Sequence, residues 1–150
     1  MADRFTKSAA RNIFYGGSLF FLILLFILTG QSHMYIVSES TDTATLSDSV
    51  VKGKRIWEEH SCVNCHTILG EGAYFAPELG NVWVRYGGKD DAEGAREGIK
   101  TWIKSQPSGI EGRRQMPAYD LTEEELDNLV DFFEWVSRID TQGWPPNDAG

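Results

Sequence analysis

The sequence predicts an all-α protein in which a single N-terminal transmembrane helix precedes a small helical domain. From Asn12 to Ser38 no residue is charged, so this stretch can form a helix long enough to cross a bilayer. Further along, three segments space their apolar residues three and four apart, as amphipathic helices do. The clearest of these begins with Thr122-Glu123-Glu124-Glu125, which has the pattern of a capping box.

The apolar N-terminal stretch favours an uncleaved membrane anchor over the alternatives, a cleaved signal peptide and a buried core helix. A signal peptide usually has an apolar region of about 7–15 residues that ends at a small-x-small cleavage site. Here the apolar run is longer, and residues 29–33 offer no convincing cleavage site. We therefore predict cytoplasmic residues 1–11, a transmembrane helix at 12–37, a linker at 38–48, a compact domain at 49–140 and a C-terminal tail at 141–150.

Charges on the two sides of the span predict its orientation. Three basic residues precede it, whereas the charged residues that follow are acidic until Lys52. By the positive-inside rule, the N-terminus is cytoplasmic and residues 39–150 lie on the far side of the membrane. In the inner membrane of a bacterium, that side is the periplasm. Gly16, Gly17 and Ser18 form a small-residue surface that either suits contact with another transmembrane helix or is merely tolerated.

Most of the negative charge lies in the compact domain. The net charge is −8, and the residues before Tyr35 contribute +2, so the remainder carries −10. Such a domain is not expected to bind nucleic acid. A basic protein, or a basic patch on an acidic one, would be attracted to it, and salt would weaken that encounter.

Cys62-Val63-Asn64-Cys65-His66 matches the C-x-x-C-H pattern of covalent haem attachment. Two thiols about one turn apart can reach the two vinyl groups of one porphyrin, and the adjacent histidine can reach the iron. The alternatives are a redox dithiol, which normally follows a strand in a βαβ unit, and half of a zinc site, which needs two more ligands at suitable spacing. The sequence meets neither condition, so we predict one haem c with His66 on its iron.

Haem iron that only transfers electrons usually has a second axial ligand. The options at this position are Met, His or no protein ligand. Met1 is the initiator and Met34 lies in or beside the span, which leaves Met116 as the candidate. A lone methionine is more often a core filler. Its place in a Gly- and Pro-rich loop, residues 106–121, argues against that role. The other long connection, residues 67–88, is also expected to pack on the haem.

Three motifs resemble class I cytochromes c. Gly53 and Trp57 match a Gly-x-x-x-aromatic pattern on the first helix, and the resemblance implies that the last helix crosses closely there, with Leu129 and Phe132 opposite. The segment Ala76-Pro77-Glu78-Leu79 resembles a loop whose proline carbonyl accepts a hydrogen bond from the proximal histidine. This implies a bond from His66 to Pro77 that fixes the ring. The pair Met116-Pro117 matches the loop that carries the distal ligand.

A narrower resemblance covers nearly the whole chain. Gly-Glu-Gly-Ala-Tyr-Phe at residues 70–75, the N-terminal anchor and the closing Gly143-Trp144-Pro145-Pro146 are similar to the small cytochrome c subunit of bacterial nitric oxide reductase. The resemblance implies a heterodimer with a large membrane-embedded catalytic subunit that reduces NO to N2O. It also implies soluble periplasmic electron donors, such as small cytochromes c or azurin-like copper proteins.

The same resemblance implies a calcium ion at the subunit boundary, bound by backbone oxygens of Gly72 and Tyr74. Aromatic packing of Tyr74 and Phe75 against the haem or the partner is the alternative. The expected mechanism is outer-sphere electron transfer, without bond chemistry in this chain. Two other functions are considered: an anchored mono-haem cytochrome that shuttles electrons or serves an oxygen-reducing haem-copper oxidase, and a haem-based gas sensor in which Met116 leaves when a gas binds.

Overall fold

The computed structural model describes residues 6–41 and 43–143. Residues 144–146 of the closing motif and most of the predicted C-terminal tail lie outside the described residues, as do the first five residues of the predicted cytoplasmic segment. The chain divides after Ser40 into two units. The expected all-α class is confirmed, because helices dominate both units.

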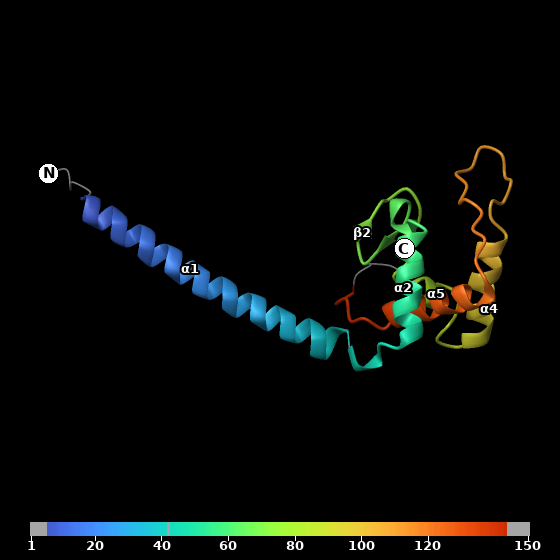
Figure 1. Cartoon of the computed structure of the whole chain (residues 1–150), viewed down its shortest axis with the longest axis horizontal. Helices are drawn as coiled ribbons and strands as arrows, with labels where there is room; N and C mark the ends of the chain where they lie inside the picture. The colour runs from blue at the N-terminus through green and yellow to red at the C-terminus, as the bar shows by residue number, and fades with distance from the viewer. Residues whose placement is uncertain (1–5, 42, 144–150) are drawn as a thin grey trace. The chain divides into compact units, whose positions relative to one another are not determined.

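The first unit is one long helix, α1 (Lys7–Tyr35), drawn in blue in Figure 1. It begins at Thr6, whose hydroxyl accepts a hydrogen bond from the amide of Ala9 at 3.2 Å, and it continues as a π-helical turn, Ile36–Ser40. Its most apolar window has a mean hydropathy of 2.2, and none of its side chains is buried. Length and composition make α1 a candidate membrane span, because such a surface is costly to expose to water.

The second unit is built from three longer helices, α2 (Asp48–Glu59), α4 (Ala92–Lys104) and α5 (Glu123–Val136), and from short α3 (Val82–Arg85). The three amphipathic helices predicted from the sequence are confirmed as α2, α4 and α5. The predicted capping box is also present: the Thr122 hydroxyl accepts from the Glu125 amide at 3.2 Å, and the Glu125 carboxylate accepts from the Thr122 amide at 2.8 Å. These bonds fix where α5 begins.

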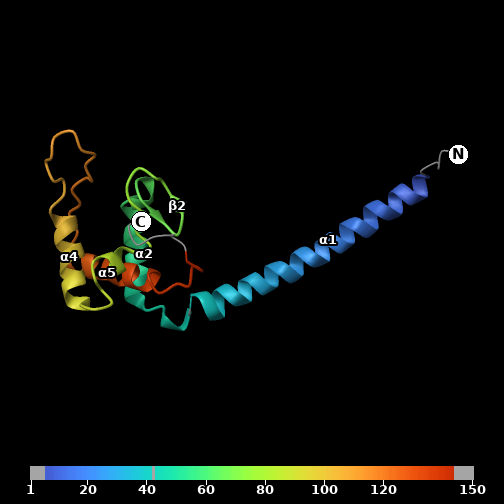
Figure 2. The same ribbon diagram turned by 180° about the vertical axis from the view of Figure 1, so that it is seen from behind.

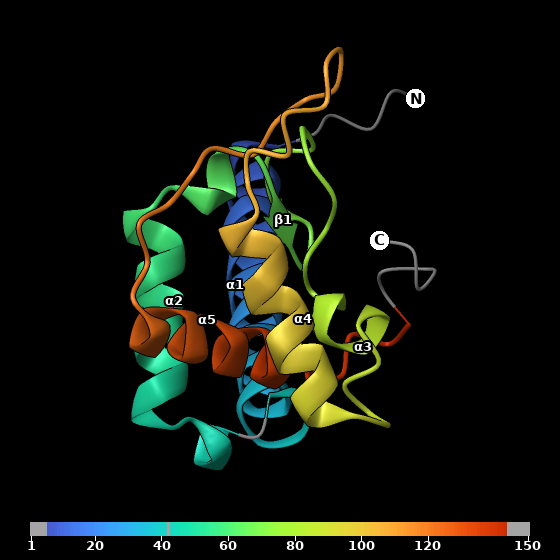
Figure 3. The same ribbon diagram turned by 90° about the vertical axis from the view of Figure 1, so that its right-hand side faces the viewer.

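Helix α5 runs across α2 and α4, as Figure 3 shows. Gly53 makes the crossing with α2 possible, because a Cβ built on it would lie 2.0 Å from the carbonyl oxygen of Asn128 and 2.7 Å from Cβ of Phe132. Phe132 lies beside Gly53, as the resemblance implies, and the backbone of Asn128 lies closest of all. Leu129, the other residue that the resemblance places at this crossing, is buried in the core.

A small hairpin and two 3₁₀ turns (Thr43–Thr45, Cys62–Asn64) complete the second unit. Strands β1 (Thr67–Ile68) and β2 (Glu71–Gly72) are antiparallel, with Thr67 opposite Gly72, and Figure 2 shows β2 at the hairpin. Leu69 and Gly70 join them with φ of 52° and 81°. Positive φ at both turn residues is typical of a type I′ turn. This region was predicted to be loop, because two-residue strands are too short for a periodic signal.

Candidate haem site

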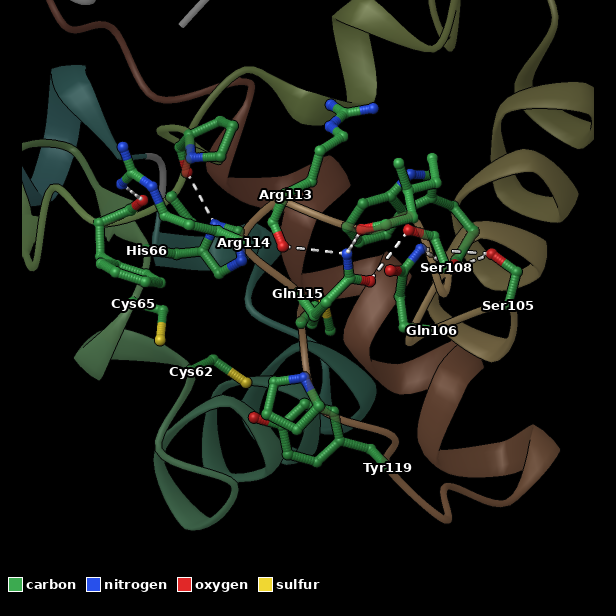
Figure 4. Close-up of a pocket in the computed structure, with 17 residues that line it drawn as sticks. Cys62, Cys65, His66, Ser105, Gln106, Ser108, Arg113, Arg114, Gln115 and Tyr119 are labelled. Carbon is green, nitrogen blue, oxygen red and sulfur yellow. Dashed lines mark hydrogen bonds between the residues drawn. The ribbon is translucent and has the colours of Figure 1, made fainter.

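The predicted haem ligands line one cavity, shown in Figure 4. Its volume is about 580 Å³, and Cys62, Cys65, His66 and Met116 all contribute to its wall. An adjoining space of about 150 Å³ shares three of these residues and extends between apolar side chains of α3, α4 and α5. The larger volume lies in the range of pockets that bury an organic ligand. The fold thus brings together side chains that are up to 54 residues apart in the sequence.

The attachment motif begins at the end of α2. Ser61 adopts a left-handed conformation with φ of 55°, which turns the chain into the 3₁₀ turn. The amides of Cys65 and His66 then donate to the carbonyl oxygen of Cys62 at 3.1 and 2.9 Å. These bonds hold the two cysteines one turn apart with both side chains half-buried at the cavity. The turn therefore provides the spacing that two vinyl groups of one porphyrin require.

The chemistry of Cys62 argues against a redox dithiol. Burial raises the pKa of this thiol to about 11, although a backbone hydrogen bond opposes the shift. A reactive dithiol needs the opposite shift, because the thiolate is the nucleophile. The zinc alternative also lacks support, because in residues 6–41 and 43–143 no three His, Cys, Asp or Glu side chains cluster as metal ligands would.

His66 is buried, and a hydrogen bond to a backbone carbonyl fixes the orientation of its ring. Nδ1 lies 2.8 Å from the carbonyl oxygen of Pro77, and a carbonyl can only accept, so Nδ1 carries the proton. Nε2 is then the nitrogen with a free lone pair for a metal. Burial lowers the pKa of His66, although the hydrogen bond to Pro77 opposes this, so the imidazole is kept in the neutral form that binds iron.

Glu78 organises the segment that carries Pro77. Its buried carboxylate accepts hydrogen bonds from the amides of Leu69 and Gly80 at 2.9 and 2.8 Å, with a longer contact of 3.4 Å to the Gly70 amide. Arg85 donates to the Glu78 carbonyl oxygen at 2.8 Å. From the sequence, Glu78 was predicted only as part of a motif and had no role of its own. The signal in the sequence that could have indicated this role is a carboxylate close to a glycine-rich segment, because the backbone amides of such a segment need acceptors.

Gly72 and Tyr74, the predicted calcium ligands, lie on the hairpin side of the site. Gly72 has φ of +126°, and a Cβ built there would lie 2.2 Å from the carbonyl oxygen of His66. The chain therefore needs glycine where β2 passes His66. Tyr74 has 74% of its surface exposed and is absent from the cavity wall, whereas Phe75 lines the cavity. Of the two aromatic residues, only Phe75 is placed to contact a ligand in the cavity.

Met116 reaches the cavity from the opposite connection, residues 106–121. Its half-buried side chain packs against the core and lines both spaces. Gln115 shapes the chain beside it: its side-chain amide donates to the carbonyl oxygens of Ile110 and Arg113 at 2.9 and 3.1 Å, and it accepts from Ser108 at 3.0 Å. Gln115 was not among the predicted functional residues.

The donor set fits a covalently bound haem. Two thiols, one imidazole and one thioether face a common space, and a cytochrome c haem uses these groups as two attachment points and two axial ligands. Polar and charged side chains line part of the larger cavity, whereas the wall of the adjoining space of about 150 Å³ is largely apolar and suits a porphyrin face. Its apolar members are Trp57, Leu79, Val82, Ile99, Ile103, Leu129 and Phe133.

Comparisons with known proteins agree with this arrangement. The family model of cytochrome c matches residues 50–137. The C subunit of nitric oxide reductase from Halomonas halodenitrificans is 63% identical to the chain, that from Paracoccus denitrificans 56% and that from Stutzerimonas stutzeri 46%, in each case over the full length of both proteins. Cytochrome c oxidase subunit 2 of Alkalihalophilus pseudofirmus is 32% identical over 89 residues, which are 59% of this chain and 25% of that protein. With a haem-type cavity in a cytochrome c domain and relatives that align from end to end, the chain belongs to the family of nitric oxide reductase C subunits.

Proposed function

We propose that the chain is the electron-transfer subunit of a membrane-bound nitric oxide reductase. It holds one haem c through Cys62 and Cys65, with His66 and Met116 as axial ligands. It accepts electrons from a soluble periplasmic donor, a small cytochrome c or an azurin-like copper protein, and passes them to a large membrane-embedded subunit that reduces NO to N2O. The observation that carries the proposal is the shared cavity of these four side chains in a chain whose full-length relatives bear that subunit's name.

The bound haem supplies reversible one-electron transfer. The protein contributes a fixed geometry: Pro77 orients His66, and the two thiols that line the cavity would attach the porphyrin. Both axial ligands are neutral, and the wall around them is largely apolar. This environment disfavours the extra positive charge of the ferric state, so a relatively high reduction potential is expected. No bond is made or broken in the subunit itself.

Membrane attachment is assigned to α1, with the N-terminus in the cytoplasm and the haem domain in the periplasm. The support is the uncharged apolar part of α1, from Asn12 onward, and the basic residues that precede this part. At the boundary with the large subunit, we assign a calcium ion to the backbone oxygens of Gly72 and Tyr74. An exposed hairpin end offers such oxygens to a hard cation, which a second subunit would help to coordinate.

The test starts from the full chain, isolated from membranes in mild detergent. We expect covalent haem, a large subunit that co-elutes, and NO consumption when a reduced periplasmic donor is added. The ferric protein should show the weak far-red band of iron–thioether bonding. Met116→Leu, which keeps the apolar volume, should lose that band. A band that persists in this variant would show that another group is the distal ligand.

A second candidate is an oxygen-reducing haem-copper oxidase as the client of the same cytochrome. The partial similarity to cytochrome c oxidase subunit 2, confined to 59% of the chain, favours it. The two candidates differ in the substrate that the co-purified complex consumes. A complex that consumes oxygen but not NO would establish the oxidase and overturn the reductase assignment.

A further inference from the structure

One side chain joins the two walls of the cavity. Nη1 of Arg114 donates to the carbonyl oxygen of Phe75 at 2.5 Å, and the Arg114 guanidinium carbon lies 4.8 Å from the centre of the Phe75 ring. Figure 4 shows this Arg114 side chain directed toward the segment that contains Cys65 and His66. A hydrogen bond from a charged donor and a cation–π contact thus act at the same pair of residues.

The positions of these two residues give the contact its significance. Arg114 lies two residues before Met116, and Phe75 lies two residues before Pro77, whose carbonyl holds His66. The contact therefore links the segment of the proposed distal ligand to the segment that supports the proximal one. Arg113, the neighbouring residue, has the same charge, but the hydrogen bond and the ring contact belong to Arg114.

The two linked segments differ in how firmly the chain holds them. The Phe75 segment is fixed on both sides, because the amide of Ala76 donates to the Cys65 carbonyl oxygen at 2.7 Å and Glu78 binds the following turn. In residues 108–115 the side-chain bonds within the loop connect only near neighbours. A contact with the fixed segment therefore limits how far this loop can move from the cavity.

We infer that Arg114 is a positioning residue that holds the 106–121 loop over the haem, so that Met116 stays on the iron. This inference rests on the proposed His66/Met116 ligation. Without the Arg114–Phe75 contact, the loop would open more often, and the sixth position of the iron would be free for a larger share of the time. Loss of one charge-assisted hydrogen bond shifts such an equilibrium by about tenfold.

Imidazole binding to the ferric full-length protein measures this opening, because imidazole can take the sixth position only when Met116 has left. Arg114→Ala is expected to bind imidazole about tenfold more tightly than the wild type. On heating, the far-red band of this variant should also disappear at a lower temperature than the band of the wild type. Arg113→Ala removes an equal charge one residue away and should behave as the wild type does. Phe75→Leu keeps the carbonyl acceptor but removes the ring, so an intermediate affinity is expected.

The outcomes separate this inference from the ligation on which it rests. If the wild type shows the far-red band and Arg114→Ala binds imidazole with wild-type affinity, the positioning role is overturned and the ligation stands. An equal increase in imidazole affinity in Arg114→Ala and Arg113→Ala would also overturn the positioning role, because the loss of charge alone would then be the cause. A wild type without the band would overturn the ligation and the inference together. Should Arg114→Ala fail to retain haem, Arg114→Gln is titrated with imidazole instead, because it keeps a donor but loses the charge. Tighter imidazole binding than in the wild type then supports the positioning role, and wild-type affinity overturns it.

Discussion

Gly53 lies so close to Asn128 that a Cβ at position 53 would come within 2.0 Å of the Asn128 carbonyl oxygen. The obstacle is backbone, so a side-chain rotation cannot relieve it. The core of the domain forms around this crossing of α2 and α5. The closeness of the two helices therefore depends on the missing side chain at one position.

Gly53→Ala should destabilise the haem-loaded domain although alanine is the better helix former. The gain in helix propensity is about 1 kcal/mol, whereas separating the two helices and loosening the core should cost about 2–4 kcal/mol. Denaturant unfolding measures the net change. Lys54→Ala, at the exposed position beside it, should change the free energy of unfolding by less than about 0.5 kcal/mol. Equal stability of both variants would show that the crossing adapts without cost.

Gly72→Ala should reduce the share of protein that carries haem. A side chain there would press on the carbonyl oxygen of His66 and displace this residue. Gly87→Ala is a matched control, because Gly87 also has a positive φ, at 81°, but has no atom within 4 Å of the added Cβ. Both variants bear the conformational cost of a positive φ, about 1–2 kcal/mol for the nearly left-handed helical conformation of Gly87. The ratio of haem absorbance to protein should fall clearly in the first variant only; a similar fall in both would place the cause in the backbone conformation.

Glu78→Gln should destabilise the segment that holds Pro77. The remaining amide oxygen can keep the two short bonds from Leu69 and Gly80, which then lose their ionic character, whereas the new NH₂ group replaces Oε2 and leaves the Gly70 N–H without its acceptor. The expected loss of unfolding free energy is about 1.5–3 kcal/mol. Glu71→Gln, at an exposed position of the same hairpin, should stay within about 0.5 kcal/mol of the wild type. A loss in Glu71→Gln as large as that in Glu78→Gln would refute the role of the buried carboxylate.

Asp127 should contribute a pH-dependent part of the stability. A hydrogen bond from Lys100 at 2.9 Å, with the nearby positive charges, holds the pKa of this carboxyl below its ordinary value. A carboxyl with a lowered folded-state pKa stabilises the fold above its unfolded pKa of about 3.9, and this stabilisation is lost as the pH falls through the folded value.

Asp127→Asn should therefore lower the free energy of unfolding by up to about 1 kcal/mol at neutral pH, and the difference from the wild type should shrink below about pH 4. Chemical denaturation across this pH range is the measurement. In a Lys100→Met background, most of the effect of Asp127→Asn should disappear, because the two residues are partners. A difference that persists unchanged to pH 3 would contradict this assignment.

Local patterns in the sequence predicted much of the fold. Helices α2, α4 and α5 were found because an amphipathic helix repeats its apolar residues every three or four positions. The beginning of α5 was found because a capping box involves only four consecutive residues, Thr122–Glu125. The attachment motif at Cys62 is equally local. Met116 was reached by elimination, and its place in the wall of the same cavity was not deducible from spacing alone.

Features that depend on contacts across the fold could not be predicted in this way. Glu78 closes its turn through amides on both sides of it, and Arg114 meets Phe75 across 39 positions. The carbonyl of Asn128, the nearest backbone neighbour of Gly53, was not predicted, because the exact rotation of two crossing helices depends on how all their side chains pack. In each case the partner is chosen by tertiary structure and has no separate signal in the sequence.

The buried carboxylate of Glu78 has a consequence for biogenesis. It supplies acceptors from within the chain, so the hairpin and the Pro77 turn have most of their hydrogen bonds before any haem arrives. The 106–121 loop, whose side-chain bonds are mainly local and exposed, gains most of its packing surface only when a porphyrin fills the cavity. Maturation of the cytochrome should accordingly proceed in two stages. Haem first binds to the folded hairpin and Pro77 turn, and the 106–121 loop then packs over the haem.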